Sequence, residues 1–437
     1  MAIGAPAFGI LRIASSRRQG PYVTQPIRIS APPASRLPCF PVTASSPPFA
    51  HFNEASILAE ARARTGLADF GDESFREPMR RMLHAFDTEA NLNEGGRLAM
   101  RERTLGLLVN RLRVEDWLAR HPEILRERIA PPIVIAGLPR TGTTMLQRLL
   151  SCDPGIYAAF FYELRNPAPI PGSDWRNDDP RIADAVTEVE QTLSAVPELA
   201  TIHPWDPMGA DEEVLLLEHA FLTTMPEAAA DVPEFGRWVD RQDHRPAYQY
   251  LERLLKFLQW QKREAGQRAN HWVLKTPSHL GFMDLVFELF PDAVVVQTHR
   301  DPLETIPSIS SMEYALRRLN ADDPDPVAAG RRWGEIFRAG LERCLERRDA
   351  RYADRFLDVW YRDVQDDPIR EVERIYGFIG RELTGEAESR MRRWLVDNAR
   401  DKRAPHRYWL EKFGFTREQM ERDFAAYRER FILPRQG

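Results

Sequence analysis

The sequence predicts an α/β protein in three layers (αβα), with a central parallel sheet between helices and a helical region before it. Short apolar runs typical of buried strands occupy residues 133–136, 272–274, 293–297 and 356–360. Each run is followed by a turn and a helix-like stretch, and strands that alternate with helices form parallel sheets covered by helices. The first run also leads directly into a glycine-rich turn, which is a further indication of this fold class.

Composition changes along the chain and divides it into three regions. Residues 1–52 are rich in proline and serine and contain no acidic side chain, so we expect a disordered leader, with a targeting segment or a start codon placed too early as alternatives. From Asn53, apolar residues recur at three- and four-residue steps, which predicts a helical region over residues 53–130. Residues 131–437 then form the α/β domain, with a mostly helical insertion over residues 165–270 that is able to cap a pocket.

Charge and cysteine content narrow the classes of function. The 60 basic and 65 acidic residues are mixed along the chain and give a net charge of -5, so we expect no nucleic acid partner. Cys39, Cys152 and Cys344 lie too far apart for zinc-ligand spacing, and we expect a reducing, cytoplasmic location and no metal. No apolar run reaches the roughly 18 residues of a transmembrane segment. The sequence leaves the oligomeric state open, and a homo-oligomer is compatible with it.

The glycine-rich turn has the residues of an anion-binding loop. It lies between the strand ending at Ala136 and a helix predicted over residues 145–150. Glycines allow a tight turn, and a helix N-terminus supplies N–H groups and a favourable dipole for phosphate. The candidate phosphate-binding residues are Arg140, Thr141, Gly142, Thr143 and Thr144. Because Thr143 replaces the lysine that grips a triphosphate in a P-loop, the loop is P-loop-like and suits a shorter anion.

A second anion site is predicted after the strand at residues 293–297. Arg300 stands at the end of this strand, and Pro302 opens a helix on which Ser308 follows. A guanidinium and a hydroxyl placed in this way bind a second phosphate, at about 1.5–3 kcal/mol for each charge-assisted hydrogen bond. The alternative is an ordinary ion pair between Arg300 and Asp301 or Glu304.

With both anion sites, the chain resembles the sulfotransferases that use 3′-phosphoadenosine 5′-phosphosulfate (PAPS), in particular the bacterial branch with the loop G-x-P-R-T/S-G-T-T. The resemblance covers roughly residues 53–431, and its motifs are residues 137–144, 274–277, 299–302 with Ser308, 361–364 with 367–368, and 406–408 with 413–414. It implies metal-independent transfer of the sulfonate of PAPS to a hydroxyl or amine of a small-molecule, lipid or carbohydrate acceptor. It also implies that the loop binds the 5′-phosphosulfate, that Arg300 and Ser308 bind the 3′-phosphate, and that Tyr361 contacts the adenine. Arg403 and Arg407 look like the segment that closes over the 3′-phosphate, although the R-K-G sequence of the cytosolic members is absent.

Sulfonate transfer needs a cation for the charge that develops around sulfur, and a base for the acceptor's proton. Lys275 follows the strand at residues 272–274 and is one of only five lysines, which favours it as the cation. Two residues compete as the base. Glu163 lies at the end of what should be the next strand, where glutamate-using members carry their base, and its structural alternative is a salt bridge with Arg165. The other candidate, His279, is slightly preferred because it adjoins Lys275 without depending on a strand assignment, and its alternative role is a helix-terminal hydrogen bond.

An acidic triplet, Asp211-Glu212-Glu213, precedes an apolar run at residues 214–217. We interpret the triplet as the acidic first turn of an amphipathic helix, which the helix dipole favours, rather than as a metal cluster. Glu212 or His219 is still able to reach an acceptor.

Two other functions are compatible with an anion-binding loop. A P-loop kinase or ATPase needs the loop lysine and a strand-terminal aspartate for Mg²⁺, and the sequence lacks both. A non-catalytic nucleotide-binding scaffold keeps both anion sites without transfer, and a loss of turnover in Lys275→Ala would argue against it.

Overall fold

Five short strands form one parallel sheet in the order β2-β3-β1-β4-β5. Their bounds are β1 Pro132–Gly137, β2 Ile156–Ala158, β3 His271–Lys275, β4 Val294–His299 and β5 Phe356–Trp360. The computed structural model describes residues 51–202, 205–398 and 409–436, and these residues belong to one compact unit. The parallel sheet confirms the α/β fold class, and strands occupy all four of the predicted positions.

The register of the sheet brings the ends of its central strands to one edge. Ile135 of β1 pairs with Lys275 of β3, and Gly137 of β1 pairs with Thr298 of β4. In open parallel sheets, ligands bind outside the carboxyl ends of the strands, where the chain leaves two neighbouring strands in opposite directions. The segments that follow β1, β3 and β4 therefore meet at the edge where a ligand is expected.

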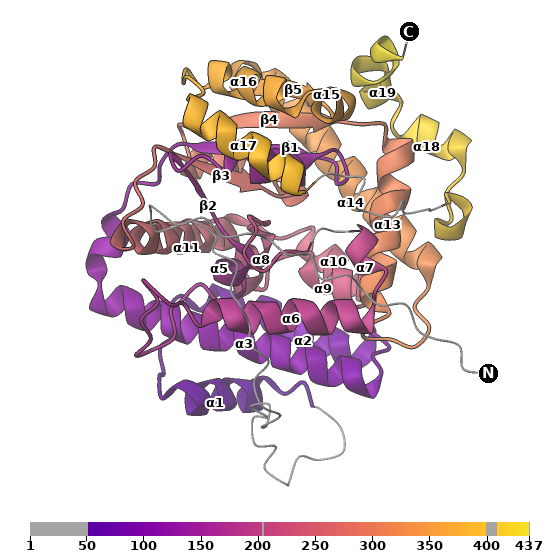
Figure 1. Cartoon of the computed structure of the whole chain (residues 1–437). Helices are drawn as coiled ribbons and strands as arrows, with labels where there is room; N and C mark the ends of the chain where they lie inside the picture. The colour runs from indigo at the N-terminus through magenta and orange to yellow at the C-terminus, as the bar shows by residue number, and fades with distance from the viewer. Residues whose placement is uncertain (1–50, 203–204, 399–408, 437) are drawn as a thin grey trace, which may run out of the picture. The chain divides into compact units, whose positions relative to one another are not determined.

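Side chains of β1 alternate between the two faces of the sheet, as the pleat requires. Ile133 and Ile135 belong to one apolar core, shared with α4 (Thr143–Leu150), α16 (Pro368–Phe378) and α17 (Gly385–Asp397). Val134 and Ala136 belong to a larger core, shared with α11 (Arg245–Glu264), α12 (Met283–Leu289) and α14 (Pro326–Arg347). In Figure 1, α16 and α17 lie near the top of the molecule, and α11 lies below the strands.

Three helices precede the sheet: α1 (Glu54–Thr65), α2 (Arg76–Thr88) and α3 (Glu94–Arg120). Asn53 caps α1 by accepting a hydrogen bond from the Ser56 N–H at 2.9 Å, and Asn93 caps α3 through the Gly96 N–H at 2.7 Å. Buried leucines of α3 join the larger core together with residues of α11. Because they share this core, the N-terminal helices are packed where they are able to form part of a ligand cavity.

The segment between β2 and β3 is mainly helical. Its helices are α5 (Phe161–Arg165), α6 (Arg181–Ala195), α7 (Leu199–Ile202), α8 (Val214–Leu217), α9 (Met225–Ala229), α10 (Pro233–Val239) and α11. The helices after β4 are α13 (Pro302–Arg317), α14, α15 (Tyr361–Asp366), α16, α17, α18 (Arg417–Asp423) and α19 (Ala425–Phe431). Among the described residues, no helix is both long enough and apolar enough to cross a bilayer.

Two local predictions are wrong. The strand expected to end near Glu163 ends at Ala158, and Glu163 lies in the short helix α5. The helix forms because the Glu163 carboxylate accepts the Phe160 N–H at 2.9 Å, as a glutamate in the first turn of a helix does. The acidic triplet is not the first turn of a helix either, since α8 begins after it, at Val214, and has no acidic residue in its first turn.

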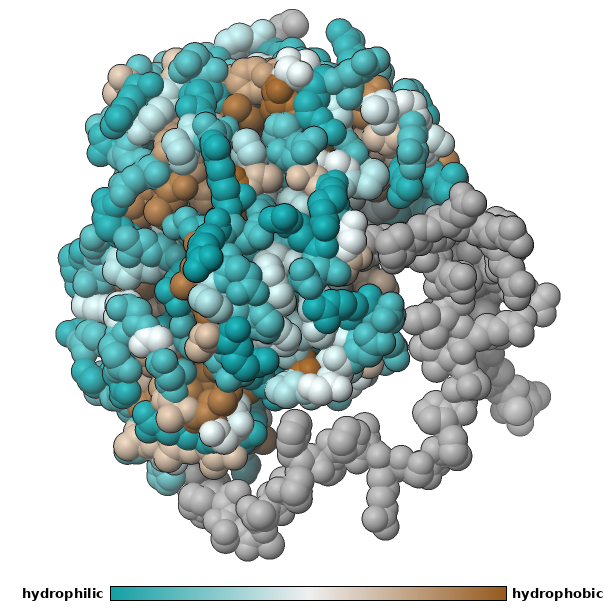
Figure 2. Space-filling model, turned by 90° about the vertical axis from the view of Figure 1, so that its left-hand side faces the viewer, coloured by the Kyte–Doolittle hydropathy of each residue, from teal (hydrophilic) through white to brown (hydrophobic). Residues whose placement is uncertain are grey.

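Hydrophilic side chains cover most of the face shown in Figure 2, and the apolar ones lie in separate patches between them. The large apolar side chains that are exposed, including Leu98, Val396 and Trp409, come from distant parts of the chain. The apolar surface that bears on function lies instead in a cavity beside the sheet edge.

Candidate active site

The loop after β1 is held tightly against β4. A Cβ atom on Gly137 would lie 2.2 Å from the Thr298 hydroxyl oxygen, so only glycine allows this approach of the two strands. Gly142 has a φ of 90°, in the left-handed region that suits glycine, and Arg140 has a φ of 68°. Non-glycine residues in that region are strained and are found preferentially at functional sites. The loop geometry therefore supports a ligand-binding role more strongly than an ordinary turn would.

The threonines of the loop face different surroundings. Thr141 is fully buried, and its hydroxyl donates to the Leu138 carbonyl at 2.7 Å and contacts the Thr298 hydroxyl at 2.6 Å. Thr143 and Thr144 form the first turn of α4, which begins without a side-chain cap. An uncapped first turn leaves its N–H groups to water or an anion. Thr141 thus fixes the loop, while Thr143 and Thr144 stand where an anion would bind.

Arg300 lies directly against this loop. Its Nη1 donates to the Arg140 carbonyl at 2.9 Å, and its guanidinium lies over the Tyr361 ring, 4.1 Å from the ring centroid. The ion pair with Glu304, which was the alternative role for Arg300, also forms, with Nε and Nη2 at 2.9 and 2.6 Å from the carboxylate. The two predicted anion sites are therefore adjacent, which is the arrangement that one ligand with two phosphate groups requires.

Of the other residues predicted to bind the nucleotide, one lies at the loop, one is buried on a neighbouring helix, and two lie outside the described residues. Tyr361 is the first residue of α15. Its ring lies against the loop after β1, because a Cβ atom on Gly142 would be 3.4 Å from the ring. Ser308 is buried on α13, the helix that Asp301 caps by accepting the Leu303 N–H at 3.1 Å. Arg403 and Arg407 lie outside the described residues.

Lys275 ends β3 beside the loop and is completely buried. Its Nζ lies 2.6 Å from Glu212 Oε1 and 3.4 Å from the Thr144 hydroxyl oxygen. Its backbone N–H donates to Glu213 Oε2 at 2.8 Å. The buried Lys275 side chain thus lies between the loop after β1 and the acidic triplet.

His279 is buried with both ring nitrogens engaged. Nε2 lies 2.7 Å from Glu213 Oε1, and Nδ1 lies 2.8 Å from the Tyr248 hydroxyl. An ionised Glu213 only accepts hydrogen bonds, so Nε2 carries the hydrogen and Nδ1 accepts from Tyr248 in the neutral imidazole. Burial raises the pKa of Tyr248 well above its usual value, which keeps its hydroxyl as a donor. The imidazole therefore connects β3 with α11 and with the segment before α8.

Glu163 is engaged in a buried ion pair. Both of its carboxylate oxygens lie 2.7 Å from Lys262 Nζ, and one of them also caps α5. Burial lowers the pKa of Lys262, and the attraction of Glu163 opposes this shift. Arg165, the partner expected from the sequence, pairs instead with Glu188 at 2.5 Å.

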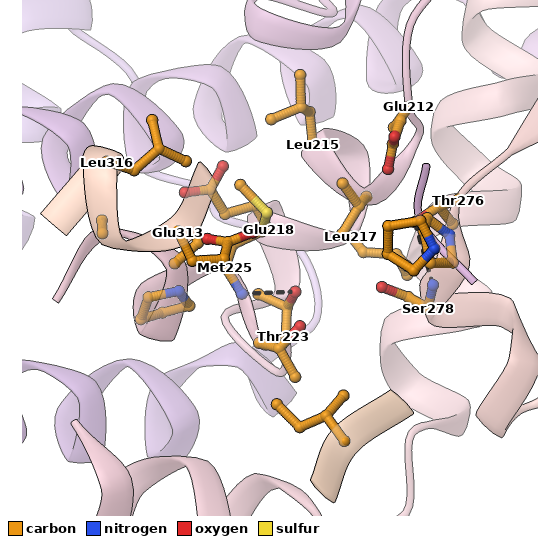
Figure 3. Close-up of a pocket in the computed structure, with 18 of the residues that line it drawn as sticks. Glu212, Leu215, Leu217, Glu218, Thr223, Met225, Thr276, Ser278, Glu313 and Leu316 are labelled. Atoms are coloured by element: carbon orange, nitrogen blue, oxygen red, sulfur yellow. Dashed lines mark hydrogen bonds between the residues drawn. The ribbon is translucent and has the colours of Figure 1, made fainter. Parts of the chain in front are cut away.

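A cavity of about 700 Å³ adjoins the loop, with Arg140, Thr143 and Thr144 in its wall. Most of its lining is apolar and comes from helices far apart in the sequence, including Phe86, Leu107, Leu215, Met312, Leu316 and Ile336. Figure 3 shows Glu212, Thr276 and Ser278 on one side of the cavity and Glu313 and Leu316 on the other. Neither Glu163 nor His279 is among the described residues that line it.

Glu212 is the charged group of the cavity wall that touches Lys275. Burial raises the pKa of its carboxyl, and the attraction of Lys275 opposes that rise. The sequence drew attention to Glu212 as part of an acidic triplet and as one of two residues able to reach an acceptor. It gave no sign that Glu213 binds both β3 and His279, because that pairing depends on a contact between segments 62 and 66 residues apart.

The parallel sheet and the uncapped loop after β1 are compatible with a nucleotide-dependent group transferase, and the loop lacks the lysine of a P-loop kinase or ATPase. A sequence profile of the sulfotransferase family matches residues 131–385, more than half of the chain, and the chain belongs to this family. It is therefore a transferase that moves a sulfonate group, and PAPS is the sulfonate donor that the family uses.

Relatives and solved structures extend this similarity beyond the family profile. The ω-hydroxy-β-dihydromenaquinone-9 sulfotransferase Stf3 of Mycobacterium bovis and Mycobacterium tuberculosis is 26% identical over 284 residues, which cover 62% of this chain and 68% of the relative. The crystal structure of sulfotransferase STF1 from Mycobacterium tuberculosis is 30% identical, with a TM-score of 0.74, and covers 86% of this chain and 98% of its own. The crystal structure of sulfotransferase STF9 from Mycobacterium avium is 27% identical, with a TM-score of 0.78, and the match covers 89% of this chain and 98% of the STF9 chain.

The residues at the sheet edge fit PAPS. The donor has anionic groups at both ends of its adenosine, and the structure offers two adjacent sites for them: the uncapped start of α4, and Arg300. The Tyr361 ring, which packs against both sites, supplies a flat surface of the kind on which a base is able to stack. When bound, PAPS supplies an activated sulfonate whose leaving group is a phosphate.

Proposed function

We propose that this protein transfers the sulfonate to a hydroxyl of a largely apolar, lipid-like acceptor held in the cavity beside the loop. The observation that carries this proposal is the cavity itself, which is large, mainly apolar, and bordered by Thr143, Thr144 and Glu212 at the place where transfer would occur. Ligand pockets of this size bury most of a small molecule and fix it with a few polar groups. The name of the Stf3 relative, a sulfotransferase of a hydroxylated menaquinone, supports the same acceptor class.

For the donor, we assign the 5′-phosphosulfate to the loop residues Arg140, Thr141, Gly142, Thr143 and Thr144. The uncapped start of α4 supports this assignment. We assign the 3′-phosphate to Arg300 and Ser308, and the adenine to Tyr361. The contact between Arg300 and the loop supports these roles.

Lys275 is the cation that we place beside the reacting group. Its ammonium lies between Thr144 and Glu212, and its burial excludes water from around the charge. A preorganised charge in a water-excluded site stabilises developing negative charge much better than a solvated one. Lys275 would therefore act mainly on the rate of transfer rather than on nucleotide affinity.

Among the three carboxyl or imidazole candidates, we assign the base role to Glu212. It lines the cavity and touches Lys275, whereas Glu163 is committed to Lys262, and His279 is committed to Glu213 and Tyr248. A raised pKa improves a carboxylate as a base near neutral pH. In this proposal, His279 and Glu213 position the end of β3, and Glu163 supports α5.

The acceptor class is tested by offering PAPS with 1-dodecanol, glucose or tyramine and measuring the sulfated product by mass spectrometry. We expect 1-dodecanol to be preferred in kcat/KM by at least about tenfold, because only its chain buries apolar surface in the cavity. Met312→Trp, which fills the cavity, should reduce transfer to 1-dodecanol, whereas Val396→Trp at an exposed position of α17 serves as the matched control. A preference for glucose or tyramine that Met312→Trp does not alter would contradict the proposal.

A further inference from the structure

One carboxyl group of the cavity wall differs from the others. Glu313 lies on α13, is only 5% exposed, and its Oε2 has no hydrogen-bond partner among the residues that the structure describes. Figure 3 shows its side chain at the cavity, on the same side as Leu316 and Met225. A buried polar atom without a partner is destabilising, by an amount comparable to a lost hydrogen bond. Because Glu313 also lines the cavity, its incompletely satisfied carboxyl group is a candidate for binding a ligand.

The other glutamates that line the cavity have cationic partners. Glu212 contacts Lys275 at 2.6 Å, Glu188 contacts Arg165 at 2.5 Å, and Glu218 is paired with Arg103. Each of these carboxyl groups thus has a cationic side chain within ion-pair distance. Glu313 is the exception among the described glutamates of this lining, so its role is not explained by an ion pair.

The surroundings of Glu313 favour its uncharged form. Burial raises its pKa to about 8, the nearby Arg317 opposes this rise, and Glu212 and Glu227 add to it. Arg317 is itself engaged with Asp231 at 2.9 Å, and Arg332 is paired with Glu227. At neutral pH the Glu313 carboxyl is therefore mostly protonated. A protonated carboxyl has an O–H donor that a carboxylate lacks.

We propose that Glu313 is a specificity-determining residue whose carboxyl group donates a hydrogen bond to a second, uncharged oxygen of the acceptor, such as a carbonyl. This inference rests on the proposed function, since it concerns an apolar alcohol in the same cavity. Glu212 then contacts the acceptor's hydroxyl, which is sulfonated, and Glu313 contacts a second oxygen farther along the same acceptor molecule. A charged acceptor group would not suit this site, because the wall around Glu313 includes the apolar side chains of Met225, Met312 and Leu316.

The test compares 1-dodecanol with a series of twelve-carbon alcohols that carry one keto group at successive positions. Equilibrium binding is measured by calorimetry with adenosine 3′,5′-bisphosphate present, so that the result does not depend on turnover. We expect at least one keto alcohol to bind about five- to tenfold more tightly than 1-dodecanol at neutral pH, as one hydrogen bond in a buried site would give. The preference should disappear as the pH rises through about 8, because the ionised carboxyl no longer donates.

Three variants separate this role from a structural one. Glu313→Leu should abolish the preference, whereas Glu313→Gln, whose amide donates at every pH, should keep it without pH dependence. Glu342→Gln, on an exposed surface of α14, is the matched control and should behave as the wild type. A preference that survives in Glu313→Leu, or a series in which no keto alcohol is preferred, would overturn the inference.

A second measurement needs no ligand. In the infrared difference spectrum between about pH 6 and about pH 9, the protonated carboxyl C=O band should be weaker in Glu313→Gln than in the wild type, and the remaining band belongs to groups such as Glu188, whose pKa burial raises to about 7. A band of equal intensity in the wild type and in Glu313→Gln would overturn the inference. Keto alcohols that bind with the Glu313-dependent preference but are not sulfated would instead contradict the proposed function and leave this inference standing.

Discussion

The proposed donor site at the carboxyl ends of the strands (the donor edge) and the proposed acceptor site in the cavity beside it (the acceptor cavity) are built in opposite ways. The donor edge consists of three short segments that follow neighbouring strands, and its key contacts are polar and close, such as Arg300 Nη1 to the Arg140 carbonyl at 2.9 Å. The acceptor cavity is lined by side chains from α2 to α14, and most of them are apolar. Anion binding depends on particular side chains at particular positions. An apolar cavity depends only on its volume and apolar lining, which many different sequences are able to provide.

The two regions meet at the ion pair between Lys275 and Glu212. Lys275 approaches the phosphate loop through Thr144, and Glu212 forms part of the cavity wall. Substitutions at this junction should have the largest effects on turnover, and substitutions on the donor side should act on affinity instead.

The largest expected effect is that of Glu212→Gln, which should lower kcat by about 10³-fold because the amide does not take up the acceptor's proton. Burial raises the pKa of Glu212, and the base acts in its ionised form. The wild-type kcat/KM should therefore fall as the pH is lowered through that pKa, and the variant should lose this acidic limb of the pH–rate profile. Glu198→Gln, at an exposed position, is the control. If His279→Gln removed the limb and Glu212→Gln kept it, the base would be His279.

Lys275→Met should lower kcat by about 10²- to 10³-fold, as the loss of one preorganised charge in a buried site does. Its affinity for adenosine 3′,5′-bisphosphate, measured by calorimetry, should change by less than about threefold, because the proposed role is in transfer. Lys256→Met on α11, where the lysine pairs with Glu252, is the control. Turnover that is unchanged in Lys275→Met would exclude the role given to this lysine.

Arg300→Ala should weaken the binding of adenosine 3′,5′-bisphosphate by at least about tenfold, since a charge-assisted contact to phosphate is lost. Adenosine 5′-phosphosulfate, which has no 3′-phosphate, should be affected much less, and calorimetry with both ligands measures the difference. Arg318→Ala, at an exposed position next to α13, is the control. An equal loss for both ligands would remove Arg300 from the 3′-phosphate site.

Much of the donor edge was predictable from the sequence, because its constraints are local. A buried strand, a glycine-rich turn and a helix start are neighbours along the chain, and Gly137 and Gly142 are required by a close contact and by a positive φ. Lys275 stood out for similar reasons, as a rare lysine directly after a predicted strand. The helices over residues 53–130 also followed from the spacing of their apolar residues.

The parallel α/β fold was predictable from the sequence alone, and so were the two segments proposed to bind anions, since both predictions depend on residues that are near one another in the chain. The carboxylate that contacts Lys275 and the helices that enclose the cavity depend on tertiary packing and did not follow from the sequence. Glu163 and His279 were reasonable candidates by position, yet Lys262, Tyr248 and Glu213 reach them from distant segments. The physical reason is that a carboxylate's role is set by its partners and its burial, and packing brings those together across long separations in sequence.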